Sequence, residues 1–226
     1  MKTIFPQVHM VTGLPAGRVY VLEDADGLTI IDTSVPGTAG IILGQIQQLG
    51  RIPSDVRRIL ITHAHPDHVG ALPQLQAQTG ARVIAAAIEQ PVIEGQIPVP
   101  RVDPAKLKGL IKFRPPKTLF KPVKVDMALE GGETLPMLGG LQAVFTPGHA
   151  PGHMAFWHPQ RRLLFCGDVL FNAPQLGLPP AFLTVDMDED KRSVQKLIDL
   201  QPEAVCFGHG EPITTQATAR LKTVVL

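Results

Sequence analysis

The sequence predicts an α/β protein whose strands and helices pack in layers. In both halves of the chain, short runs of β-branched and other apolar residues alternate with segments of helical character. The 22 prolines and 21 glycines among 226 residues indicate many turns, which a helical bundle would not need. The hydrophobic content of 44% is enough for one sizeable core. These patterns predict layers but do not specify which layered fold the chain adopts.

The first half of the chain opens on a predicted β-hairpin, because two apolar runs flank a turn that contains Gly27. Two predicted helices end at Gly50 and at Gly80. Pro73 fits the second of these helices only if it falls in the first turn. The elements expected here are strands at 18–23 and 28–32, a helix at 38–49, a strand at 57–62, a helix over 68–80 and a strand at 82–87.

The stretch at about 89–125 is rich in proline and basic residues, and we interpret it as an insertion into a single domain that spans 1–226. A short helix at 104–112 is expected within it. Its bases indicate either a lid that attracts an anionic substrate or a solvated flap that serves solubility or dimer contacts. The flap requires no ligand and is the preferred interpretation.

The second half of the chain returns to strands. Its expected elements are strands at 141–146, 153–158 and 161–167, a helix at 186–200, a strand that starts at about 203, and a last short helix. Cys166 and Cys206 lie in two of these strands as small buried hydrophobes, so no disulfide framework is expected. Phe156 and Trp157 are expected in the core.

The charge balance and hydropathy of the chain exclude several classes of protein. A formal net charge of +1 does not call for nucleic acid or an anionic membrane as a partner. No apolar run approaches the roughly 20 residues that cross a bilayer. The first residues lack the apolar stretch of a secretory signal, so a cytoplasmic protein is expected.

The run ILITHAHPDHVG carries the strongest chemical signal. A buried strand ends at Thr62, and four residues that can bind metal follow within six positions: His63, His65, Asp67 and His68. The spacing of two can project the first two rings the same way from an extended segment. The last two sit where a helix begins and can face another direction. One loop can therefore serve two metal ions, whereas a chance cluster would be a poor explanation for three of the eight histidines.

Three further candidates follow later strands, each beside a glycine: His149, Asp168 and His209. Functional groups on loops at strand ends are typical of a rigid scaffold. Glycine beside such a residue lets the main chain come close to an ion.

These residues resemble the signature of the metallo-β-lactamase superfamily, His-x-His-x-Asp-His followed by a later His, Asp and His, over the range 32–209. The resemblance implies a four-layer αβ/βα sandwich with a pair of divalent ions, chiefly zinc, with iron or manganese as alternatives. It implies that His63, His65 and His149 bind the first ion, that Asp67, His68 and His209 bind the second, and that Asp168 bridges both.

The resemblance also suggests roles around the ions. Asp32 would support a ligand from behind, and His153, in the pattern TPGHxxGH, would be a supporting residue rather than a ligand. Asp67 would also be catalytic, by orienting the nucleophile or passing its proton to the leaving group. Phe171 is a candidate for contact with substrate, with core packing as the alternative. His9 and His158 have no such context and are expected to be ordinary histidines.

The resulting hypothesis is a hydrolase in which a metal-bridging hydroxide cleaves an ester, thioester or lactone of a small, possibly anionic molecule. The segment GDVLF resembles the GDTLF of glyoxalase II-type enzymes. In that group a C-terminal helical region binds glutathione, whereas this chain ends soon after His209. Lactonases of the superfamily carry tyrosine where Phe171 stands. Asp168 disfavours opening of β-lactams, because those enzymes generally have cysteine or serine there. The alternatives are a phosphodiesterase or nuclease, a mono-iron sulfur dioxygenase, and a scaffold without activity. A homodimer is also considered.

Overall fold

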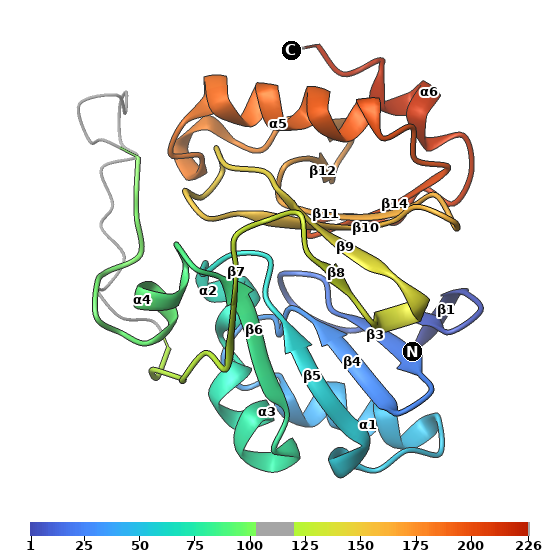
Figure 1. Cartoon of the computed structure of the whole chain (residues 1–226), viewed down its shortest axis with the longest axis vertical. Helices are drawn as coiled ribbons and strands as arrows, with labels where there is room; N and C mark the ends of the chain where they lie inside the picture. Colours follow the sequence, from blue (N-terminus) through green and yellow to red (C-terminus); the bar gives the residue numbers. More distant parts are fainter. Residues whose placement is uncertain (103–119, 226) are drawn as a thin grey trace.

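The computed structural model describes residues 1–102 and 120–225, which fold into two facing sheets with helices on both outer sides (Figure 1). This arrangement confirms the predicted four-layer sandwich. The helix expected at 104–112 lies outside the described residues. Among the described residues, no helix is both long enough and apolar enough to span a bilayer.

The first half of the chain forms one sheet in the order β1-β2-β3-β4-β5-β6-β7, antiparallel up to β4 and parallel from β4 to β7. Because β4, β5 and β6 are parallel, the loops that follow them leave the sheet at the same edge. The elements of this half are β1 (Lys2–Phe5), β2 (Val8–Met10), β3 (Tyr20–Asp24), β4 (Gly27–Ile31), α1 (Ala39–Gln48), β5 (Val56–Leu60), α2 (Pro66–Val69), α3 (Leu72–Thr79), β6 (Arg82–Ala86), α4 (Gln90–Ile93) and β7 (Met127–Leu129).

The second half forms a sheet in the order β14-β11-β10-β9-β8, beside a two-stranded ribbon of β12 and β13. Strands β11 and β14 are parallel, so their following loops also share an edge. The elements are β8 (Thr134–Leu135), β9 (Leu141–Phe145), β10 (Met154–His158), β11 (Leu163–Gly167), β12 (Phe171–Asn172), β13 (Leu176–Gly177), α5 (Met187–Asp199), β14 (Ala204–Phe207) and α6 (Ala217–Leu221).

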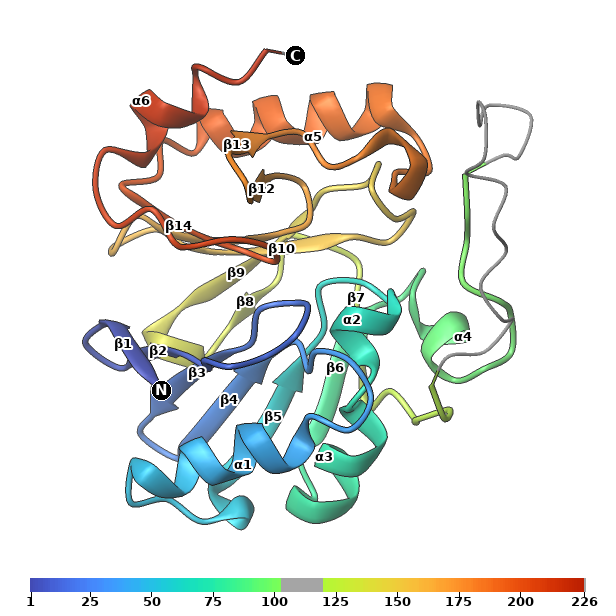
Figure 2. The ribbon, with the colours of Figure 1, turned by 180° about the vertical axis from the view of Figure 1, so that it is seen from behind.

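Three apolar clusters hold the four layers together. One lies between the first sheet and α1 and α3, where Ile42 packs with Ile59. A second lies between the sheets and includes Leu60 and Phe156, and the third joins the second sheet to α5 and α6 (Figure 2). Each sheet therefore buries both of its faces, as a layered α/β protein requires.

Local sequence explains most of the elements. Helix α5 begins with the Asp186 side chain accepting a hydrogen bond from the main-chain N–H of Glu189 at 3.0 Å, and its first turn is acidic. Pro73 does fall in the first turn of α3, and Gly80 ends that helix in a left-handed conformation with φ of 68°. The sequence did not predict β1, β2, β7, β8, β12 or β13, which are too short, at two to four residues, to show a periodic pattern.

Candidate metal centre

The loop after β5 presents the first four candidate ligands. His63 and His65 lie in the extended segment, and Pro66 starts α2, which turns Asp67 and His68 in another direction. The His63 and His68 side chains are fully buried, whereas Asp67 is partly accessible to solvent. The loop is tied to the second sheet by the N–H of Met154, which donates to the Thr62 carbonyl at 2.8 Å.

The second sheet supplies one candidate from each of three loops. His149 lies in the turn between β9 and β10, Asp168 directly follows β11, and His209 follows β14. Gly208 is needed beside the last of these, because a Cβ atom there would lie 1.9 Å from Oδ1 of Asp168. The expected close approach of the main chain at a glycine is therefore present.

The structure brings all seven predicted side chains together. His63, His65 and His149, here called the three-histidine group, place one ligand atom each within 4.8 Å of one another. Asp67, His68 and His209, the mixed group, do the same. The atoms Nε2 of His149 and Nδ1 of His65 are 2.9 Å apart, which shows how tightly the first group converges.

Asp168 lies where the two groups meet. Its Oδ2 is 3.4 Å from Nε2 of His149 and 3.3 Å from Nε2 of His209, and its Oδ1 is 3.3 Å from Nε2 of His68. The same Oδ2 lies 3.9 Å from Nε2 of His63, so one carboxylate faces two histidines of the three-histidine group and two of the mixed group. This is the position that a ligand shared by two ions would need.

The donor set fits divalent ions. Nε2 of His63, Nε2 of His68 and Oδ1 of Asp168 are buried and make no hydrogen bond. Buried polar atoms are costly to leave unpaired, so their convergence here indicates a missing binding partner. Imidazole nitrogen with carboxylate oxygen is the ligand chemistry of zinc, iron and manganese.

Asp32 supports the cluster from behind, in the position that the sequence suggested. Its Oδ2 lies 2.8 Å from Nδ1 of His68 and accepts a hydrogen bond from the Thr62 hydroxyl at 2.8 Å. Its Oδ1 accepts from the Thr62 N–H at 2.8 Å. The contact fixes the ring so that Nε2 of His68 faces the cluster. Thr62 Oγ1 also lies 3.1 Å from Nδ1 of His63.

His153 packs against the His63 ring, with centroids 5.0 Å apart, but directs both of its nitrogens to other partners. Its Nε2 accepts a hydrogen bond from the Asp168 N–H at 3.0 Å, and its Nδ1 lies 2.8 Å from the Thr146 hydroxyl. Burial lowers the pKa of His153 to about 3, so the ring stays neutral. With both nitrogens engaged, His153 holds Asp168 in place and has no nitrogen left for an ion.

The three-histidine group consists of neutral rings. Burial, together with the neighbouring His68, lowers the pKa of His63 well below its usual range. Burial likewise lowers the pKa of His149 well below that range and brings the pKa of His65 to about 4. A neutral imidazole offers the lone pair that an ion requires.

The mixed group is charged in the absence of metal. Burial lowers the pKa of His209, but its bonds to the carboxylates of Asp168 and Asp67 outweigh burial and raise it to about 9. Burial raises the pKa of Asp67, but the nearby His68 and His209 outweigh it and bring it to about 2. Protonated histidine therefore neutralises the negative charge of the carboxylates, a role that bound cations would otherwise have.

The remaining histidines and Phe171 are also placed. Nε2 of His9 lies 2.9 Å from Oε1 of Glu23, and Nε2 of His158 lies 2.9 Å from the Leu138 carbonyl, so both rings have partners outside the cluster. The Phe171 ring stacks on His209 with centroids 4.4 Å apart. It is half-buried at the edge of the mixed group, where both of its predicted roles stay open.

The structure also shows a buried carboxylate that sequence reasoning did not single out. Glu89 is 1% exposed and accepts hydrogen bonds from two main-chain N–H groups beside the candidate ligands. The sequence offers one signal only, an acid shortly after the apolar strand 82–87, at a position that falls within the predicted insertion.

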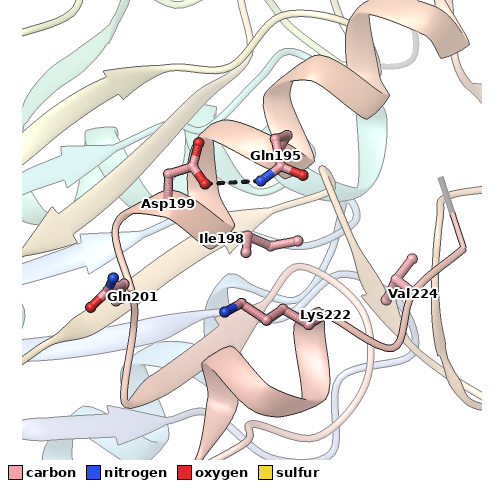
Figure 3. A pocket seen from close by; sticks show the side chains of 6 residues that line it. All are labelled: Gln195, Ile198, Asp199, Gln201, Lys222 and Val224. Carbon is pink, nitrogen blue, oxygen red and sulfur yellow. Dashed lines mark hydrogen bonds between the residues drawn. The ribbon is translucent and has the colours of Figure 1, made fainter.

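Two hollows in the surface lie away from the cluster. One, of about 430 Å³, lies between the end of α5 and the C-terminal segment and is lined by Gln195, Asp199 and Lys222, among others (Figure 3). The other, of about 520 Å³, is lined by Glu94 and Lys124 with their neighbours. Neither contains a candidate ligand, so the chemistry is assigned to the histidine–aspartate cluster.

Comparison with known proteins agrees with this assignment. The profile of the metallo-beta-lactamase superfamily matches residues 12–209. The probable metallo-hydrolase YflN of Bacillus subtilis is 30% identical over 92% of this chain and 85% of its own length. A hydroxyacylglutathione hydrolase of Methylococcus capsulatus is 31% identical over 97% of this chain and 71% of its own length. A crystal structure of the metallo-beta-lactamase family protein TTHA1429 from Thermus thermophilus is 25% identical, with a TM-score of 0.75 over 97% of this chain and 79% of that one.

Proposed function

The chain belongs to the metallo-β-lactamase superfamily, and we propose that it is a hydrolase with two divalent ions, zinc by preference, that cleaves an ester, thioester or lactone of a small molecule. The observation that carries the proposal is the convergence of the three-histidine group and the mixed group on Asp168. Ions bound there would lower the pKa of water to about 7 and polarise a substrate carbonyl.

We infer that Asp67 handles the proton. It is the most solvent-accessible carboxylate of the cluster, and its Oδ2 lies 3.1 Å from Nε2 of His209. Its lowered pKa keeps the carboxylate ionised, so Asp67 has no proton of its own to donate; as the more exposed carboxylate it can orient the attacking water and receive a proton from it. The proton it gains would then pass to the leaving oxygen or sulfur.

The thioester class is favoured by one finding: a hydroxyacylglutathione hydrolase is among the relatives that match most of the chain. The phosphodiesterase alternative rests on the basic insertion, most of whose bases lie at 103–119, outside the described residues, and it stays an alternative for the assay below to decide. The described part of the centre contributes histidines and carboxylates, with Phe171 beside them.

The proposal is tested by assaying zinc-loaded protein against a p-nitrophenyl ester, an acyl-glutathione, a lactone and bis-p-nitrophenyl phosphate. We expect turnover of at least one carboxyl substrate and none of the phosphodiester, with two zinc ions per chain by elemental analysis. Asp188→Ala, at an exposed aspartate of α5, serves as the matched control for substitutions of the cluster. Cleavage of the phosphodiester alone, or one iron per chain with oxygen uptake, would overturn it.

A further inference from the structure

Glu89 has an unusual set of partners for a buried acid. It directly precedes α4 and is 1% exposed, and no ion pair to it is present in the described part of the chain. Its Oε2 accepts a hydrogen bond from the N–H of Ala64 at 2.9 Å, and its Oε1 accepts one from the N–H of Gly152 at 2.8 Å. Both oxygens are thus used on main-chain groups of two other loops.

The two loops are those that carry the three-histidine group. Ala64 stands between His63 and His65, and Gly152 closes the turn that begins at His149. The first loop follows the first sheet and the second joins two strands of the second sheet, so one carboxylate links ligand-bearing segments from both halves. Asp67, His68 and His209 make no hydrogen bond to it.

The fit around this carboxylate is close. A Cβ atom at Gly152 would lie 2.8 Å from both Cγ and Oε1 of Glu89, so no other residue leaves room for the contact. Helix α4, which Glu89 directly precedes, lies beside α2 in both views (Figures 1 and 2). A simple cap for α4 would not need partners in two remote loops.

We propose that Glu89 is a positioning residue that fixes the spacing of His63 and His65 relative to His149, and so sets the metal affinity of the three-histidine group but not of the mixed group. This inference rests on the proposed function only in requiring that the cluster binds metal. Residues behind metal ligands typically alter affinity about 10–100-fold when they are removed.

The test is zinc affinity, measured by competition with a chromophoric chelator, for Glu89→Gln. An amide keeps one acceptor but turns an NH₂ group toward the other N–H, so one link between the loops is lost. Glu89→Gln is combined with a second substitution that disables one group. His209→Ala disables the mixed group and leaves the three-histidine group intact, and His149→Ala does the reverse. We expect affinity to fall about 10–100-fold in the first background and less than about twofold in the second.

Glu133→Gln is the matched control, because both oxygens of Glu133 also accept main-chain N–H bonds, from Glu130 and Gly131, in a turn away from the cluster. It should leave both affinities unchanged. If Glu89→Gln does not fold, Glu89→Asp, which keeps the charge but shortens the reach, should give the same selective loss.

Equal loss in both backgrounds, or no loss in either, would overturn the role of Glu89. Normal zinc binding without hydrolysis of any carboxyl substrate would instead overturn only the proposed function. A wild-type protein that binds no metal would overturn both.

Discussion

The two ligand groups of the centre are built in opposite ways. The three-histidine group is buried and neutral, whereas the mixed group is more exposed and held by charge, with His209 and Asp67 in contact at 3.1 Å. The first group has its lone pairs available without loss of a proton. The second must release protons before it can bind an ion. If two ions bind as proposed, the three-histidine group would be preformed for one of them, whereas the mixed group would have to exchange protons for the other.

The largest expected effect comes from removing the residue that both groups share. Asp168→Ala deletes the carboxylate that faces His149, His68 and His209, and leaves their rings crowded without an anion. We expect loss of most bound zinc and a decrease in kcat/KM of at least about 10³-fold. Elemental analysis and initial rates measure both, with Asp188→Ala as the control. Retention of two ions by Asp168→Ala would contradict its position between the groups.

Substitution of Asp32 should have a smaller effect, and one that differs between the two groups. In Asp32→Asn an NH₂ group must face one of the donors that Asp32 now accepts, which weakens the hold on Nδ1 of His68. We expect zinc affinity of the mixed group to fall about 10–100-fold. The three-histidine group should change less, since Asp32 reaches His63 only through Thr62.

The control for this substitution is Asp126→Asn, because Asp126 accepts one main-chain hydrogen bond, from Val83 at 2.9 Å, outside the centre. It should leave the affinity of both groups unchanged. Equal losses at both groups in Asp32→Asn would mean that Asp32 stabilises the whole loop rather than one ring.

The protons of the mixed group predict a difference in pH dependence. The pKa of His209 is raised to about 9 in the metal-free chain, so at lower pH a proton competes with the ion for this ring. Zinc affinity of the mixed group should therefore fall at least about tenfold for each pH unit from 9 to 7, because the neighbouring carboxylates also outweigh burial and raise the pKa of His68, whose proton adds to the competition. The three-histidine group should keep its affinity over that range, because His65, with a pKa of about 4, is already neutral.

Chelator competition at pH 7, 8 and 9 in the His209→Ala and His149→Ala backgrounds measures these two slopes. A flat profile for the mixed group would contradict the proton exchange. A steep profile for the three-histidine group would show that its rings are protonated near neutrality.

The candidate ligands of both groups could be predicted from the sequence. The sequence predicts His63, His65, Asp67 and His68 as candidate ligands because four such residues follow one strand, and His149, Asp168 and His209 because each stands beside a glycine at a strand end. These are signals in residue type and spacing. The supporting role suggested for Asp32 agrees with its contact to His68, although sequence could not name Thr62 as its second partner.

Glu89 shows why the rest of the centre could not be predicted. Its partners are main-chain N–H groups, which every residue except proline possesses, so no residue type marks the contact. Its loops lie 25 and 63 residues away in the chain and meet only because the two sheets face each other. The short strands β7 and β8 were missed for a related reason, since tertiary pairing rather than local pattern defines them.

The smallest expected effect concerns Phe171, which lies closer to the mixed group than to the three-histidine group. Its ring stacks on His209 at 4.4 Å, with planes 29° apart, and lies 6.3 Å from His149. Phe171→Leu keeps an apolar side chain but loses the stacking, worth about 0.5–1.5 kcal/mol for aromatic pairs, so zinc affinity of the mixed group should fall roughly two- to tenfold. Phe182→Leu, at an exposed phenylalanine, is the control. A raised KM with unchanged zinc affinity would instead show that Phe171 contacts the substrate. Its ring would then serve substrate binding rather than support of His209.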